Sequence, residues 1–103
     1  MTTPPTQADV RVYRSPWASG TRVVHYHGPV VGRIEGEMES LEKLIAECLA
    51  AIKDRCLAES CTDIVDFQTT VRLLEERRLE VSMIGTAAVL EPLFGGPMPE
   101  SDL

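Results

Sequence analysis

The stretch Glu39–Glu59, ESLEKLIAECLAAIKDRCLAE, decides the fold because its apolar residues return at steps of three and four. Charged residues, among them Glu42, Glu47 and Lys53, fill the opposite side, and Ser40 stands where an N-cap is expected. The apolar residues form one stripe: Leu41, Leu44, Ile45, Cys48, Leu49, Ile52 and Cys56. The pattern therefore predicts one amphipathic helix near the middle of the chain.

Two strands are predicted before this helix. Residues 10–13 (VRVY) alternate apolar and charged side chains, and residues 15–20 (SPWASG) read as a turn. A second strand, from Thr21 to about Ile34, is rich in β-branched and aromatic residues. Pro29 has no N–H to give to a sheet ladder, so it indicates an edge position, a bulge or a bend in this strand.

Two more strands are predicted after the helix. Residues 63–73 alternate, with Val65, Phe67, Thr69, Val71 and Leu73 expected on one face. A charged connection, EERR at residues 75–78, leads into a last strand at residues 79–90. Its expected inward residues are Leu79, Val81, Met83, Gly85, Ala87 and Val89.

The element order strand–strand–helix–strand–strand predicts an α+β fold, with a small antiparallel or mixed sheet of about four strands and one helix packed on one face. Residues 1–9 hold too little apolar surface to order themselves and are expected to form a disordered arm. Residues 10–91 form the single domain. Residues 92–103, with three prolines and two glycines, are expected to form a flexible tail.

Composition narrows the possible partners and location. With 103 residues and a formal net charge of −6, the chain has room for one core and little attraction for nucleic acid or an anionic membrane surface. The N-terminus lacks the basic and apolar segments of a signal peptide. Three cysteines, an odd number, indicate reduced thiols, and a cytoplasmic location is expected.

Two strand motifs resemble a known family. Residues 26–32 (YHGPVVG) and 82–89 (SMIGTAAV) are similar to the Tyr-x-Gly-x-Val-x-Gly and Ser-x-x-Gly-Thr-Ala motifs of the YbjQ family, small proteins described as heavy-metal-binding domains with a dodecin-like fold. The resemblance spans roughly residues 10–91 and implies a homo-oligomer, typically a ring of five, of poorly defined activity. The chain departs from the family in lacking a longer insertion before the helix, in reading SCTD at residues 60–63, and in carrying Asp66 at a family glycine.

A sheet covered by one helix leaves its second face open, and a second copy of the chain is the expected cover. The sequence thus predicts a non-enzymatic homo-oligomer that acts as a binding or assembly module. The residues expected at the subunit interface are Tyr26, Val30, Ile64, Ile84 and Ala88. The termini are expected to offer a site for a protein partner, because Trp17, Leu93 and Phe94 have no obvious core; the alternative is that Trp17 and Phe94 close the end of the core.

The alternative function is metal binding through His25 and His27, which lie two residues apart on a strand and so are expected to face one side. Two imidazoles do not complete a site for a transition-metal ion. The alternative without metal binding is a pair of partly exposed strand histidines. Cys48 and Cys56 belong to the helix stripe and read as core residues, while Cys61 is less certain. No catalytic residue and no cofactor are assigned. A weaker third hypothesis is a ligand held between subunits, as small dodecin-like assemblies hold flavins.

Overall fold

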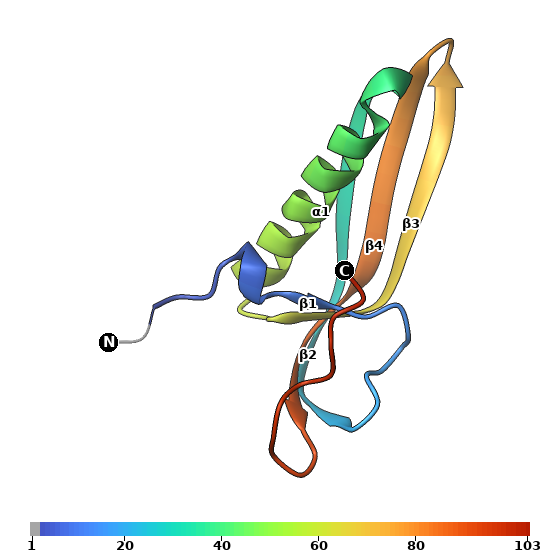
Figure 1. Cartoon of the computed structure of the whole chain (residues 1–103). Coiled ribbons are helices and arrows are strands. Elements are labelled where there is room, and N and C mark those ends of the chain that lie inside the picture. The colour runs from blue at the N-terminus through green and yellow to red at the C-terminus, as the bar shows by residue number, and fades with distance from the viewer. Residues whose placement is uncertain (1–2) are drawn as a thin grey trace.

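Strand β4 (Arg78–Pro92) is the centre of the sheet in the computed structural model, which describes residues 3–103 (Figure 1). It pairs antiparallel with β2 (Thr21–Glu37) on one side and with β3 (Asp63–Glu75) on the other. A short strand, β1 (Arg11–Val12), adds to β3 in parallel, which gives the order β1-β3-β4-β2. The fold is α+β with one mixed, open sheet of four strands, as the sequence predicts.

The helix α1 (Leu41–Ala58) confirms the apolar stripe. It follows a 3-10 turn (Met38–Ser40) and buries Leu44, Cys48, Ile52 and Cys56 against the sheet. Ser40 stands at the N-cap, although its side chain makes no capping hydrogen bond. The helix packs over β2 and β4, so it covers one half of one sheet face (Figure 1).

Two glycines of the strand motifs allow the layers to approach closely. A Cβ on Gly32 would lie 3.0 Å from the Cys48 carbonyl oxygen and 3.3 Å from Ile52 Cβ, so α1 approaches the β2 backbone closely at this position. A Cβ on Gly85 would overlap the Ile64 side chain. Gly32 and Gly85 are therefore packing positions in this chain, whereas a Cβ on the third motif glycine, Gly28, would meet nothing within 4 Å.

A bulge in β3 corrects the expected alternation. Val65 pairs with Thr86 but Gln68 pairs with Ile84, so one extra residue is inserted, and Asp66 takes a positive φ of 54°. Ile64 and Phe67 consequently lie in the core beneath the helix, whereas Val65 joins a second cluster on the other face. The expectation that Val65 shares a face with Phe67 is wrong, because a strict period of two does not survive an inserted residue.

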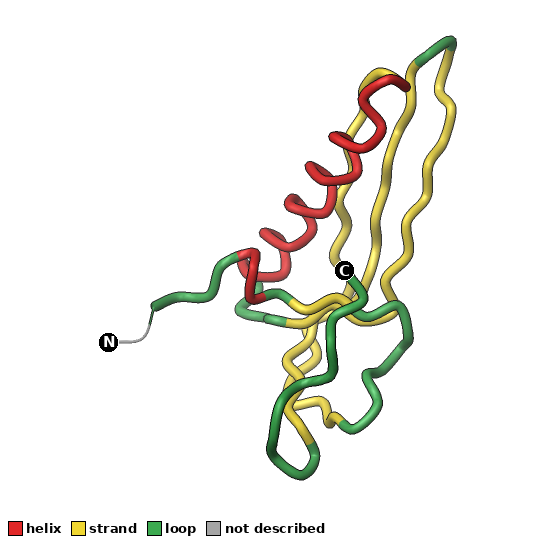
Figure 2. The backbone as a smooth tube through the Cα atoms, viewed as in Figure 1, coloured by secondary structure: helices red, strands yellow, loops and turns green. Residues whose placement is uncertain are grey.

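The second sheet face is covered at one end by the chain itself. Tyr13, Ala18, Val65, Ala88 and Leu90 form this second cluster, and Met98 packs against it from the C-terminal segment. Figure 2 shows the two loop segments, one before β2 and one after β4, that lie at this end of the molecule. A second copy was the expected cover for this face, and at this end the chain's own residues cover it instead.

The other end of the second face is polar. Glu80 is nearly buried there, with a carboxylate oxygen 3.8 Å from Arg33 Nε and another 3.4 Å from Arg72 Nη2. Thr70 and Ser82 form the next cross-strand pair. An antiparallel sheet can carry such a face in contact with water, so this half needs no cover.

The termini carry contacts that the sequence did not predict. A 3-10 turn (Gln7–Asp9) lies beside the helix, where Gln7 Nε2 donates to Asp54 Oδ1 at 2.8 Å. Beyond Pro92, the C-terminal segment runs back along β1, and Asp102 N donates to the Val12 carbonyl at 2.8 Å. The expected disorder of residues 1–9 and the expected flexibility of residues 92–103 stay predictions about motion, and residues 1 and 2 of the first segment lie outside the described residues.

No helix within residues 3–103 combines the length and apolar character that crossing a bilayer requires.

Candidate functional site

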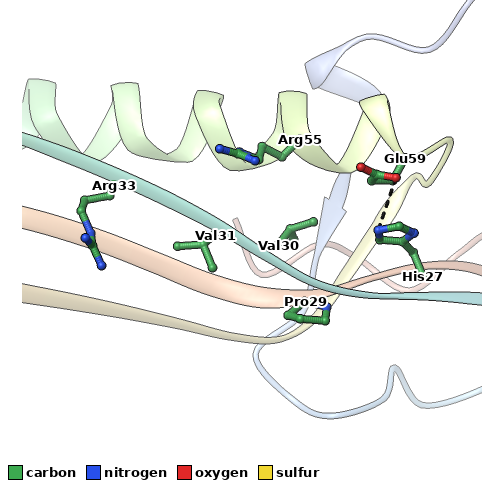
Figure 3. A pocket seen from close by; sticks show the side chains of 7 residues that line it. All are labelled: His27, Pro29, Val30, Val31, Arg33, Arg55 and Glu59. Atoms are coloured by element: carbon green, nitrogen blue, oxygen red, sulfur yellow. Dashed lines mark ion pairs between the residues drawn. The ribbon is translucent and has the colours of Figure 1, made fainter.

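A cavity of about 490 Å³ opens between the outer edge of β2 and the last turn of α1 (Figure 3). Its floor is apolar and comes from β2, where Val30 is buried and Pro29 and Val31 are exposed. β2 is irregular just before this floor, since two bulges interrupt its pairing with β4 and Gly28 has a φ of 139°. The irregular segment and the cavity therefore adjoin on the same strand.

Four titratable side chains surround the cavity. Arg55 and Glu59 come from the end of α1 and His27 comes from β2, whereas the side chain of the fourth, Arg33 of β2, points away from α1 (Figure 3), toward Glu80 on the second face of the sheet. His27 Nε2 lies 3.3 Å from Glu59 Oε2, and each of these side chains is partly exposed. On its helix side the cavity thus combines the buried Val30 with one guanidinium group, that of Arg55, and an imidazole–carboxylate pair, a set that can bind a small polar ligand.

The two histidines of the metal hypothesis have different surroundings. His27 lines the cavity and contacts Glu59, whereas His25 is exposed and is not among the lining residues. His27 is also the inserted residue of a bulge, because Tyr26 pairs with Ala88 and Gly28 with Ala87. The strict alternation behind their expected common face is therefore broken. Within residues 3–103 no three His, Cys, Asp or Glu side chains are grouped as metal ligands.

Three of the five expected interface residues are buried within the chain. Val30 and Ile64 lie in the core beneath the helix, and Ala88 lies in the second cluster. Their expected exposure is corrected for a physical reason: the Asp66 bulge turns Ile64 toward the helix, and the chain's own loops cover Ala88. Tyr26 and Ile84 are 53% and 46% exposed, so their place in an interface stays a prediction.

The three cysteines are buried and free. Burial raises the pKa of all three thiols, and that of Cys56 to about 12. A thiol that stays protonated is a poor nucleophile. Cys48 and Cys56 both lie in the core cluster, which confirms their expected core roles. Cys61, which the sequence left open, is fully buried as well.

Sequence reasoning missed a buried ion pair that joins three strands. The Asp63 carboxylate, with no exposed surface, accepts hydrogen bonds from Arg11 Nε at 2.7 Å and Arg11 Nη2 at 3.1 Å. It also accepts from Thr62 Oγ1 and from the Leu90 N–H, both at 3.0 Å. The hydrogen bond to Asp63 raises the pKa of Arg11. The only signal in the sequence was a carboxylate at the start of an apolar strand.

Comparison with known proteins shows a likeness in fold to a solved structure. No family model matches the chain, and neither does any curated protein. Among solved structures, the chain is similar to a protein of unknown function from Pediococcus pentosaceus that belongs to the DUF74 family. The two share 13% identity with a TM-score of 0.56, over 80% of this chain and 98% of that one. At this identity the likeness shows a shared fold and nothing about activity.

Proposed function

We propose that this chain is a non-enzymatic homo-oligomeric assembly module of the cytoplasm, in which copies associate through exposed apolar surface. The observation that carries the proposal is a two-stranded arm, residues 21–26 of β2 and 88–92 of β4, which starts opposite Asp63, the first residue of β3, and extends beyond it (Figure 1). On this arm Val23, Val24 and Tyr26 are 41%, 54% and 53% exposed.

The shape of the chain supports association. Its radius of gyration is 14.8 Å, against about 13 Å for a compact domain of this length. Its accessible surface is 6670 Å², against about 5,800 Å² for a compact monomer of its mass. The excess of about 900 Å² is comparable to the roughly 800 Å² that each partner buries in a standard interface.

More apolar side chains surround the arm. Trp17 and Leu93 are 68% and 50% exposed, and Phe94 is 95% exposed, so none of them closes the core. Exposed apolar groups gathered at one end of a molecule mark an interaction site. A contact between copies is the occupant that we propose, and the surface also leaves the termini accessible to a further protein partner.

A ring is the form of assembly that we propose, five-membered by resemblance to the YbjQ family. The same resemblance, together with the fold shared with a DUF74 protein, is the basis for proposing a YbjQ-like relationship for this chain. A ring requires two different complementary surfaces on each copy. The arm is one candidate, and the free edge of β3 beyond Phe67, which has no neighbouring strand within residues 3–103, is the other.

Light scattering at micromolar concentration tests the proposal. The expected mass is a multiple of 11.4 kDa, and replacing the arm residues together, Val24→Thr with Tyr26→Ser, should shift it toward the monomer. Met38→Thr is the matched control, because Met38 is 44% exposed and lies outside the arm. A monomer mass for the wild type at every concentration overturns the proposal.

The second candidate function is binding of a transition-metal ion by His25 and His27. The observation that favours it is the contact of His27 Nε2 with Glu59, since a carboxylate beside an imidazole is a common ligand pair. A neighbouring copy would have to supply further ligands. Calorimetry with zinc, copper and nickel on the wild type and on His25→Ala/His27→Ala decides it, and equal heats from the two proteins rule it out.

A further inference from the structure

The C-terminal segment, residues 97–103, lies along the outer edge of β1. Ser101 Oγ accepts from the Val12 N–H, and Asp102 N donates to the Val12 carbonyl, each at 2.8 Å. Asp102 Oδ2 accepts from the Arg14 N–H, also at 2.8 Å. The segment therefore adds to β1 much as a bound peptide adds to a sheet edge.

The chain also holds this segment by apolar packing and by a side-chain hydrogen bond. Tyr13 OH donates to the Pro99 carbonyl at 2.8 Å. Met98 packs on the second cluster, where Tyr13, Ala18 and Leu90 are each at most 5% exposed. The contact combines a specific backbone pattern with apolar burial, so it is a binding site whose present ligand is the chain's own end.

The connection to this segment has the properties of a hinge. Gly95 and Gly96 have φ values of 72° and 87°, and a Cβ on either would meet nothing within 4 Å. Leu93 and Phe94, just before them, are largely exposed. Figure 1 shows the chain leaving β4 at the lower end, turning in an open loop and returning past β1. The loop has little packing of its own to hold it closed.

We propose that in the assembled protein residues 97–103 dock on β1 of a neighbouring copy, so that the C-terminal segments are exchanged between subunits. The inference rests on the proposed homo-oligomer. β1 makes the same hydrogen bonds whichever copy supplies the segment, and inside an assembly a neighbour's segment has a local concentration similar to that of the chain's own. Leu93 and Phe94 come before the hinge, so they stay just after β4 of their own copy, at the place where the exchanged segment crosses to the neighbour and the two copies meet.

A cysteine pair across this contact tests the exchange. The Arg14 N–H donates to the Asp102 carboxylate at 2.8 Å, so Arg14→Cys/Asp102→Cys places two thiols on neighbouring residues of the two segments. After oxidation, denaturing electrophoresis without reductant should show most chains as covalent dimers and higher multiples. Arg14→Cys/Glu76→Cys is the control; Glu76 is exposed in the β3–β4 connection, and this variant should run as single chains.

The outcomes separate the exchange from the assembly itself. Covalent multiples that appear only in the Arg14/Asp102 variant support the exchange. If that variant is an oligomer by light scattering but runs as a single chain under denaturing conditions, its disulfide lies within one copy and the exchange is overturned, while the proposed function stands. A monomer by light scattering, with the same internal disulfide, overturns both.

Discussion

The two halves of β3 have opposite surroundings, although one apolar alternation was expected to run through both. In the first half Asp63, Ile64, Val65 and Phe67 are at most 3% exposed, and β1 covers the strand edge. In the second half Val71 and Leu73 are 46% and 61% exposed, and no strand within residues 3–103 borders them. The difference teaches that an alternating sequence makes a strand, while its neighbours decide how much of the strand is buried.

The largest expected effect comes from breaking the buried half at Asp63. Asp63→Ala leaves the Arg11 guanidinium and the Leu90 N–H without their carboxylate, so we expect a loss of about 3–5 kcal/mol in the free energy of unfolding. Chemical denaturation measures it. The matched control is Glu75→Ala at the other end of the strand, where an exposed contact with Arg78 at 3.9 Å should change stability by less than about 1 kcal/mol. Equal losses from the two variants would contradict the comparison.

A pH dependence is expected from Cys56, which donates to the Asp63 carbonyl at 3.5 Å. Burial raises the pKa of this thiol from 9.0 to about 12. Above about pH 9 the native state therefore keeps a thiol proton that the unfolded chain loses. The contribution of Cys56 to the free energy of unfolding is complete below about pH 9 and disappears between about pH 9 and 12. In that pH range the Cys56 thiol lowers the free energy of unfolding by about 1.4 kcal/mol for each pH unit.

Unfolding curves at pH 8.5 and 10.5 for the wild type and Cys56→Ala measure this dependence. The variant starts less stable, and its stability should fall less steeply with pH. An unchanged slope would show that the Cys56 thiol titrates normally, which is inconsistent with the burial of this end of the strand.

The boundary between the two halves lies at Asp66, whose positive φ favours glycine. Asp66→Gly should raise the free energy of unfolding by up to about 1 kcal/mol, because the strain of the left-handed backbone is relieved. Asp66→Val, with a β-branched side chain in the same conformation, should lower it by about 1–2 kcal/mol. If both variants are destabilised to the same extent, the bulge is not the feature that divides the strand.

The smallest effect is expected in the exposed half. Leu73→Thr should change the free energy of unfolding of the single chain by no more than about 0.5 kcal/mol, since most of the leucine already contacts water. Denaturation at the lowest workable protein concentration measures it. A larger loss that grows with protein concentration would place Leu73 in a contact between copies.

The parts of the fold that the sequence predicted are those decided by local pattern. The helix stripe and the inward face of β4 needed only periodicity, and Pro29 correctly indicated an edge strand with bulges nearby. The parts that it missed depend on residues far apart in the chain. Arg11 lies 52 positions from Asp63, and Val12 lies 89 positions from Ser101, so no window of sequence contains either contact.

The candidate site was predicted only in part, for the same reason. His27 was named from its strand position, but its partner Glu59 belongs to the end of the helix, and the cavity arises where the two elements meet. The interface residues were chosen by alternation, which fails wherever a bulge inserts a residue. The one visible sign that β3 would depart from a period of two was Asp66, at a position where the YbjQ family, which the sequence resembles, has a glycine.

The irregular edge of β2 affects how readily the protein can aggregate into fibres. An open sheet has two edges to which strands of further chains can pair, and fibres grow when strand pairing continues at both edges. Here Pro29 lacks an amide donor, and two inserted residues kink the same edge, so it is a poor template for stacking. Backbone pairing through β2 is therefore disfavoured, so copies that meet through the side chains of the arm and the free edge of β3 form small, closed particles more readily than amyloid.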